Sequence, residues 1–367
     1  MNAWDLYVTD RVGTRQAQID PYESAEVHAR VNDISTWQVV LPTDTDAGQW
    51  FITDSFARLE IVLDHAVWRS GPVTRLQRQV EIDGDMLTVN GVDDTVWLQR
   101  RNAHPQPGTA APPYATTAYD VHNGNVAAVL AELVRVNAGP SAVAARQVPG
   151  LVVPVPAPAG PVISVSARWQ NLLTLMQDTA RPARIIFDVV DLTFHAYAAT
   201  DRGAVFSAGL ETLGGWTMIA EAATTNKVVV AGQGTGSARL IREASDATSI
   251  GTWGLAETFQ DRRDTADTTE LDKAGAETLA AGIRPTTVVF APLDTDGQAF
   301  GRDWSLGDTV TVMAGGLTVI DQIREVHVVL DENGATITPS VGAPAGDLAL
   351  FRSLAGLDRR VRQLERI

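Results

Sequence analysis

Three glycines follow an apolar run in the segment VVVAGQGTGS, and their spacing is the first candidate for chemistry in this chain. A strand that leads into Gly232, Gly234 and Gly236 suggests a loop that could hold the phosphates of a nucleotide. The dinucleotide fingerprint, however, requires a third glycine one residue later and a helix that begins there. Position 237 is a serine, the following ARLIRE is typical of a strand, and no Lys-Ser or Lys-Thr pair follows. The segment predicts a glycine-rich hairpin corner, and no cofactor is expected.

Histidines and cysteines are the next candidates, because they are the usual ligands of zinc and the usual nucleophiles and bases. The histidines are His28, His65, His104, His122, His195 and His327. None lies within four residues of another and no His-Glu-x-x-His motif occurs, so no metal site is predicted. Each histidine is interpreted as a surface or strand residue. The chain has no cysteine, which excludes disulfides, Cys-ligated zinc and thiol catalysis.

Carboxylates are concentrated in the segment DRRDTADTTELD, residues 261–272. The acidic side chains are Asp261, Asp264, Asp267, Glu270 and Asp272, with Arg262 and Arg263 between them. A glycosidase needs two carboxylates at a defined separation in a cleft, and a calcium loop needs a central glycine that this run lacks. The run is therefore interpreted as a solvated loop that caps the next helix, or as a polar contact with a neighbouring subunit.

Other motifs give no support for catalysis either. No Gly-x-Ser-x-Gly elbow occurs, so no nucleophilic serine is predicted. Asp93 and Asp94 are expected to cap a short helical turn that contains Trp97. The sequence therefore predicts no catalytic residue, no metal site and no enzymatic activity.

The composition is that of a soluble globular protein with a strongly acidic balance. The formal net charge of −15 argues against a general nucleic-acid binder, because such proteins neutralise phosphates with basic side chains. The N-terminal MNAWDLYVTD has no basic region followed by an apolar one, so no secretory signal is expected. The longest apolar stretch, PGLVVPVPAPAGPVISV, contains five prolines and is not expected to cross a membrane.

Residues 1–103 are predicted to form a first β-rich domain. RLEIVLDHAVWRSGPVTRLQ, residues 58–77, reads as two strands that turn at Asp64-His65, with Trp68 and a Gly71-Pro72 corner in the second. A further hairpin is expected around an Asp83-Gly84-Asp85 turn. Short strands separated by turn residues indicate a sandwich or a small barrel.

Residues 104–215 are predicted to form an α+β domain with proline-rich loops. One amphipathic helix is expected to begin at Asn123 or Asn125 and to end at Gly139-Pro140. A second helix, in SARWQNLLTLMQDTARP, should stop before Pro182. ARIIFDVVDLTFHAYAA then alternates with a period of two and predicts a hairpin.

Residues 216–343 are predicted to form a second β-rich domain, and residues 344–367 a short C-terminal helix. The second β-rich domain has a helical insertion at about 252–285, with a helix that starts near Thr268. In the terminal segment apolar residues recur at spacings of four, three, four and three, which is the seam of a coiled coil. The seam residues, predicted to mediate oligomerisation, are Leu350, Leu354, Leu357, Val361 and Leu364.

The order of these segments resembles a known family, the tail hub proteins of long-tailed actinobacterial phages. This is the siphovirus minor-tail or Gp37-like type, which is related in fold to the baseplate hub of contractile-tailed phages. The resemblance rests on an ordered set of segments across nearly the whole chain: DISTWQVVLP, WRSGPVT, LTVNGVDDTVWLQRR, RWQNLLTLM, VVVAGQGTG, ETFQDRRDTADTTELDKAG and WSLGDTVTV.

The resemblance implies a structural hub that closes the tail tube. It implies a homotrimeric ring in which each chain contributes two tube-like β-barrel domains, with the α+β domain between them. The implied partners are the distal tail protein or tail tube above, tip, spike or fibre proteins below, and the tape-measure protein in the lumen, through which DNA also passes. Longer family members carry cell-wall enzymes after the hub, and no such activity is expected for a chain that ends at Ile367. The alternatives are a tail-associated cell-wall hydrolase and a carbohydrate-binding tail protein.

Overall fold

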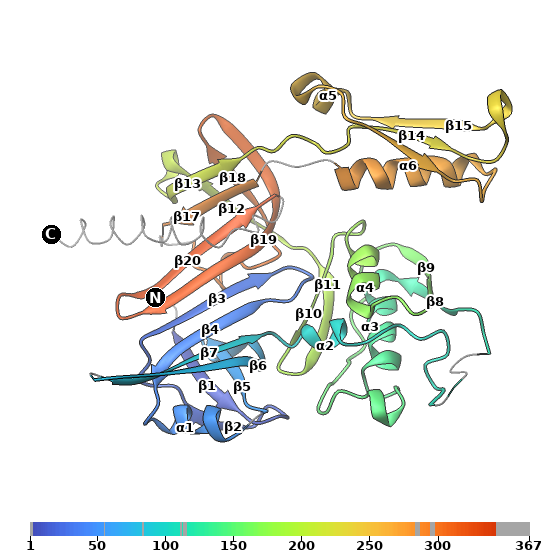
Figure 1. The fold of residues 1–367 in the computed structure, drawn as a ribbon. Helices are drawn as coiled ribbons and strands as arrows, with labels where there is room; N and C mark the ends of the chain where they lie inside the picture. The colour runs from blue at the N-terminus through green and yellow to red at the C-terminus, as the bar shows by residue number, and fades with distance from the viewer. Residues whose placement is uncertain are drawn as a thin grey trace. The chain divides into compact units, whose positions relative to one another are not determined.

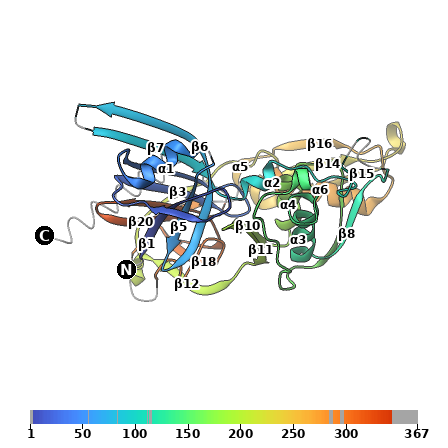
Figure 2. The same cartoon turned by 90° about the horizontal axis from the view of Figure 1, so that it is seen from below.

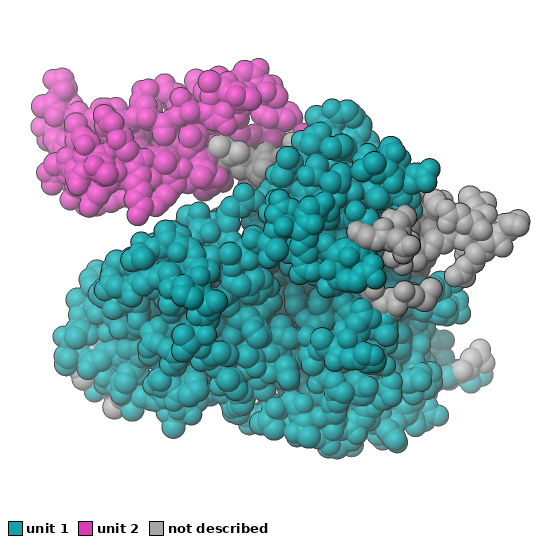
Figure 3. Space-filling view, turned by 180° about the vertical axis from the view of Figure 1, so that it is seen from behind, with its two compact units in different colours: residues 1–216, 289–367 teal, residues 217–288 magenta. Residues whose placement is uncertain are grey.

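A computed structural model describes residues 3–342 except 55, 83, 111, 113–115, 283–286 and 294–297. The chain is mainly β, as predicted, and it divides into two compact units, residues 1–216 with 289–367 and residues 217–288 (Figure 3). The predicted domain boundaries at residues 103, 215 and 343 were not drawn from these two units, and they stay predictions. The five residues of the predicted heptad seam lie outside the described residues.

The first unit is built on one sheet that runs through both ends of the chain (Figure 1). Its main path runs β13-β17-β20-β19-β3-β4-β7-β6-β5-β1-β2, and β18 joins it beside β19 and carries β12. The strands of residues 3–103 are β1 (Trp4–Thr9), β2 (Arg15–Gln18), β3 (Ser24–Arg30), β4 (Thr36–Pro42), β5 (Arg58–Leu63), β6 (Ala66–Glu81) and β7 (Gly84–Val92). Two helices belong to the same segment, α1 (Asp46–Thr53) and α2 (Val96–Gln99).

Strand β4 illustrates why this segment forms a sheet with one apolar face. Trp37, Val39 and Leu41 are buried and alternate with less buried Gln38 and Val40, which is the period of two of a strand covered on one side. The buried residues of β4 lie opposite buried residues of β7 in the antiparallel register. The core of this segment therefore lies on one face of β3, β4 and β7.

The middle of the chain forms two small hairpin-like sheets around two helices. Its elements are β8 (Asp120–Asn125), α3 (Val126–Asn137), a 3-10 turn (Ala144–Arg146), β9 (Val162–Ala167), α4 (Leu172–Ala180), β10 (Ile185–Val190) and β11 (Thr193–Ala198). Asn125 is the N-cap of α3, and its side chain accepts a hydrogen bond from the Ala128 N–H at 3.1 Å. The helix α4 ends before Pro182 and β10 pairs with β11, as predicted. Buried Leu130, Leu172 and Phe187 belong to the shared core.

The last part of the chain returns to the main sheet. Its elements are β12 (Asp201–Ser207), a 3-10 turn (Ala208–Leu210), β13 (Leu213–Ile219), β17 (Thr287–Pro292), β18 (Thr309–Ala314), β19 (Leu317–Asp331) and β20 (Gly334–Val341). The strand β19 pairs with β3 in antiparallel register, with His327 opposite His28. This pairing joins segments that are about three hundred residues apart, so the first unit cannot be split between its N- and C-terminal parts without breaking a ladder of backbone hydrogen bonds.

Aromatic rings also join the two ends of the chain inside the first unit. Trp68 packs edge-on against Trp4, with ring centroids 5.3 Å apart, and against Phe300 at 5.6 Å. Phe300 in turn contacts Trp304 at 4.9 Å, and Trp304 contacts Phe206 at 5.5 Å. Trp68 therefore packs in the contact between the first and last thirds of the chain.

The second unit is a small two-layer α/β fold between β13 and β17. Its elements are β14 (Lys227–Ala231), a 3-10 turn (Gly236–Ala238), β15 (Ile241–Ser245), α5 (Ala247–Trp253), β16 (Glu257–Asp261) and α6 (Thr268–Gly282). The sheet order is β15-β14-β16, and Val228 and Val230 of the central strand form a core with Leu271 of α6. The predicted helix start near Thr268 is confirmed.

Candidate assembly site

The strand β6 changes its partner at the Gly71-Pro72 pair. Residues before this point pair with β5, up to Pro72 opposite Arg58, and residues from Val73 onward pair with β7. Gly71 is required because a Cβ there would lie 2.0 Å from the Val92 carbonyl oxygen. Pro72 donates no backbone hydrogen bond, which suits the point where one ladder ends and the next begins. The predicted strand corner is confirmed.

A buried ion pair fixes this corner. Arg58 of β5, 2% exposed, donates from Nη2 to Oδ2 of the fully buried Asp94 at 2.6 Å. Ser70 donates to the same oxygen at 2.6 Å, and the Trp97 indole donates to Oδ1 at 3.1 Å. Asp94 therefore joins β5, β6 and α2, and the prediction that it caps the helical turn is wrong. Sequence reasoning missed this role, because its partner Arg58 is thirty-six residues away and gives no local signal.

Asp93 lies beside this ion pair and does take part in the turn. Its Oδ1 accepts a hydrogen bond from the Thr95 N–H at 3.2 Å, and its backbone oxygen accepts one from Val96. Burial raises the pKa of Asp93 to about 7, although Ser35 and Arg69 act in the opposite direction. The folded protein therefore holds a proton on Asp93 at pH values where the unfolded chain has released it.

Stability should consequently depend on pH through Asp93. Between the ordinary carboxyl value of 3.8 and about 7, the folded state binds more protons than the unfolded state, so stability falls as pH rises through this window. Asp93→Asn cannot ionise and should escape this loss. We expect the Tm of the variant, relative to wild type, to rise between pH about 4 and pH about 7 and then to level off. A Tm difference that stays flat across this window would contradict the assignment.

Beyond the corner, β6 and β7 extend as a two-stranded arm, residues 74–81 and 84–90 (Figure 2). From Thr74 to Glu81 every residue of β6 is exposed, and this stretch pairs with β7 on one side only among the described strands. Its other edge presents backbone N–H and C=O groups to the outside. Leu76 is 41% exposed and Val80 is 68% exposed.

The two faces of the arm continue the two faces of the sheet. Leu76 lies opposite Val89, and Val80 opposite Asp85, in the register of β6 with β7. Val89 is fully buried, so Leu76 and Val80 lie on the face of the arm that continues the apolar face of the sheet, past the end of its core. Arg78, opposite the buried Leu87, lies between them on the same face and forms an exposed ion pair with Asp85 there. The other face is polar: Arg75 lies opposite Asn90 and Gln77 opposite Thr88. Sequence reasoning predicted this hairpin but not that its apolar face lacks cover.

The structure assigns simple roles to the other residues that could have done chemistry. Gly232, Gly234 and Gly236 lie in the connection between the paired strands β14 and β15, and this connection leads directly into a strand, not into an α-helix. The prediction of a hairpin corner is confirmed. In the acidic run Asp267 accepts a hydrogen bond from the Thr269 N–H at the start of α6, at 2.8 Å. Arg262 pairs with Asp264 on the surface at 3.0 Å. Asp261 and Asp272 also pair with arginines, so capping and surface ion pairs account for four of the five carboxylates of this run.

Two histidines that are far apart in sequence meet in the main sheet. His28 and His327 are both buried, with ring centroids 6.1 Å apart, and His327 Nε2 lies 2.7 Å from Oε1 of Glu26. His28 lies 3.6 Å from Glu325. No group of three potential metal ligands forms among the residues that the structure describes. We interpret this cluster as part of the β3–β19 contact.

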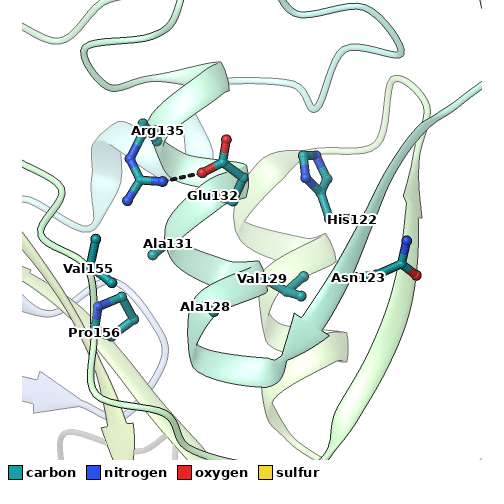
Figure 4. A pocket seen from close by; sticks show the side chains of 9 residues that line it. All are labelled: His122, Asn123, Ala128, Val129, Ala131, Glu132, Arg135, Val155 and Pro156. Carbon is teal, nitrogen blue, oxygen red and sulfur yellow. Dashed lines mark hydrogen bonds and ion pairs between the residues drawn. The ribbon is translucent and has the colours of Figure 1, made fainter.

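A pocket of about 260 Å³ lies in the middle of the chain (Figure 4). It is lined by His122, Asn123, Ala128, Val129, Ala131, Glu132, Arg135, Val155 and Pro156. Its charged groups are already engaged: Arg135 pairs with Glu132, and His122 Nε2 lies 2.7 Å from Oδ2 of Asp120. Each charged residue of this described lining therefore already has an ion-pair partner. We assign no reaction to the pocket.

The second unit leaves one face of its sheet open within the unit. Val228 and Val230 face α6, so the alternate residues of the sheet point to the other side. Ile241 of β15 and Phe259 of β16 lie on that side and are exposed.

None of the described helices is long and apolar enough to span a bilayer.

A family model matches residues 5–343, nearly the whole chain, and its description is siphovirus ReqiPepy6 Gp37-like protein. The chain belongs to this family. The search of curated proteins found no match. The prediction of a Gp37-like protein, made from the order of sequence segments, is confirmed.

Solved structures of tail proteins share the fold of this Gp37-like chain. The 43 kDa tail protein of prophage MuSo2 from Shewanella oneidensis has a TM-score of 0.62 at 11% identity, covering 93% of this chain and 98% of its own. A tail protein from Neisseria meningitidis MC58 gives 0.58 at 13% identity, covering 93% and 97%. The prophage tail protein gp18 from Listeria monocytogenes EGD-e gives 0.55 at 10% identity, covering 98% and 99%. At these identities the likeness concerns the fold.

Proposed function

We propose that the protein is a structural hub of a phage tail, located in the virion tail and assembled in the host cytoplasm. The observation that carries the proposal is the fold shared with three tail proteins over at least 93% of this chain. In this role it forms a ring at the baseplate or tail tip, closes the tail tube and contributes to the channel for genome ejection. Membership of the Gp37-like family supports the same role.

The proposed ring is a homotrimer with two tube-like β-barrel domains in each chain. One barrel corresponds to residues 1–103 and the other to 216–343, with the α+β domain 104–215 between them, so that six barrels would surround the axis. The C-terminal heptad would add a short coiled coil at 344–367. A seam of two heptads is too short to hold three chains together, so most of the interface must involve the barrels.

The main sheet offers a suitable wall for the channel. Across β3, β4, β7 and β6 its polar face carries mostly uncharged side chains such as Gln38, Asn90 and Gln77. Charges of both signs occur on it, among them Glu26 and Arg75. We propose that this face lines the lumen, because a wall that is neutral or acidic would not hold DNA by counterion release.

The proposed partners follow from this position. The distal tail protein or the tail tube would sit above the ring, and tip, spike or fibre proteins below it. The tape-measure protein would occupy the lumen before ejection, and DNA would pass through it transiently. No cofactor is proposed.

We expect no hydrolase activity, against the alternative of a tail-associated cell-wall enzyme. In the acidic run Asp267 caps a helix, and Asp261, Asp264 and Asp272 pair with arginines. The described lining of the pocket in the middle of the chain has a single carboxylate, Glu132, which pairs with Arg135. Purified protein incubated with host cell wall should release no soluble sugar or peptide above background. Release that disappears on changing Asp261, Asp264 or Glu270 to Ala would establish an enzyme instead.

Native mass spectrometry of the purified protein tests the proposed ring. The expected mass is three times 39.3 kDa. A stable dimer, a ring of six subunits or a monomer at micromolar concentration would count against the trimer. A carbohydrate-binding monomer would instead bind host polysaccharide without assembling.

A further inference from the structure

We infer that the β6–β7 arm is the surface through which a second copy of this chain joins the first, and that Leu76 and Val80 are buried in that contact. The inference rests on the proposed ring and specifies where its subunits meet. It starts from the register: Leu76 and Val80 share a face with the buried Val89 but stand beyond the core that covers it. A two-stranded ribbon in water is marginally stable by itself, and the two exposed apolar side chains on this one, on either side of the Arg78–Asp85 ion pair, would be stabilised by cover.

The edge of the arm supports the same conclusion. From Thr74 to Glu81 the outer edge of β6 has no partner among the described strands. An open edge of this length is a template for pairing with another strand, and natural proteins cover or block such edges. The charge of Arg78, between Leu76 and Val80, is paired with Asp85 of the neighbouring strand β7, so it does not block the outer edge.

The chain itself provides a complementary surface, which favours a second copy over an unrelated partner. The main path of the sheet continues past β6 to β5, β1 and β2, but the arm lies beyond the residues of β6 that pair with β5, so its outer edge is open. The strand β13 is at the far end of this path. Among the described strands β13 also has one neighbour only, and its Trp216 is exposed. Joining the open edge of the arm to the open edge of β13 in the next copy is a head-to-tail contact, and contacts of this kind form a ring when the rotation between copies closes.

Charge also favours a second copy. The stretch Thr74–Glu81 carries two arginines and one glutamate, which gives a local charge of +1, whereas the whole chain has a formal net charge of −15. Identical acidic chains repel one another through their net negative charge. This exposed strand is not negatively charged, so it does not add to that repulsion when two copies meet here.

The test compares two double variants of the arm by native mass spectrometry of the full chain. Leu76→Lys with Val80→Lys places two charges on the apolar face, and Gln77→Lys with Gln79→Lys places the same two charges on the polar face of the same strand. All four side chains are exposed, so both variants should keep the wild-type Tm. We expect the apparent Kd of the assembly to rise at least tenfold in the first variant. In the second variant it should stay at the wild-type value.

The outcomes separate the arm from the ring. A wild-type trimer with an unaffected Leu76→Lys/Val80→Lys variant overturns the arm assignment and leaves the ring intact. Loss of assembly in both variants overturns the assignment to the apolar face. A wild-type monomer overturns the ring and the arm contact together.

A labelling experiment provides an independent readout, because the chain has no cysteine and an introduced thiol is unique. Val80→Cys and Val162→Cys are matched sites, 68% and 82% exposed in the single chain. In the assembled protein we expect a maleimide to modify residue 80 at least tenfold more slowly than residue 162. Equal rates in the trimer would contradict the contact.

Discussion

Replacing Asp94 with alanine is expected to lower the free energy of unfolding by about 3–5 kcal/mol, because Arg58 would remain buried without its counter-charge. Asp94 is the acceptor of the Arg58 Nη2 hydrogen bond, and Nε and Nη1 of Arg58 have no hydrogen-bond acceptor among the described residues. The substitution also removes the acceptor of Ser70 and of the Trp97 indole. Denaturant unfolding followed by tryptophan fluorescence would measure the loss.

Two further variants make this prediction specific. Arg58→Met in the Asp94→Ala background removes the stranded charge and should recover part of the lost stability, as expected when both partners of a buried pair are replaced. Arg78→Ala breaks the exposed pair of Arg78 with Asp85 and should change stability little. If Asp94→Ala were no more destabilising than Arg78→Ala, the buried pair would not be what holds the corner of β6.

Replacing Trp304 with alanine is expected to cost about 3–5 kcal/mol, the usual range for truncating a buried aromatic residue. Trp304 is 1% exposed, packs against Phe206 and Phe300, and donates from its indole to the Gln298 carbonyl oxygen at 2.8 Å. Thermal unfolding would measure the loss. Trp304→Phe keeps a ring and should cost less.

The exposed Trp253 is the matched control for this substitution. Its replacement by alanine should change the free energy of unfolding by less than about 1 kcal/mol, since little apolar surface would be lost from the core. Equal losses for Trp304→Ala and Trp253→Ala would mean that the aromatic contacts of Trp304 with Phe206 and Phe300 contribute little.

Local patterns were sufficient to predict the elements that short-range chemistry determines. The N-cap at Asn125, the end of α4 before Pro182, the β10–β11 hairpin and the start of α6 all follow from residues within a few positions of one another. The Gly71-Pro72 corner was also predictable, because a glycine followed by a proline rarely occurs inside an uninterrupted ladder.

The long-range contacts could not be predicted from these patterns. The pairing of β3 with β19 and the ion pair of Arg58 with Asp94 join residues whose neighbours in sequence give no hint of the partner. Asp94 was interpreted as a helix cap because a local role is what an isolated Asp-Asp-Thr suggests. Likewise, the alternation that includes Leu76 and Val80 shows that they share a face, but not that the core ends before it reaches them.

The central claim, a hub ring at the end of the tail tube, is tested most directly by a three-dimensional reconstruction of the tail that contains this protein. We predict three copies around the axis below the tube, with the polar face of β3, β4, β7 and β6 toward the lumen and the β6–β7 arm against a neighbouring copy. A reconstruction that places the chain outside the tube axis, as a peripheral fibre or a single copy, would contradict this account.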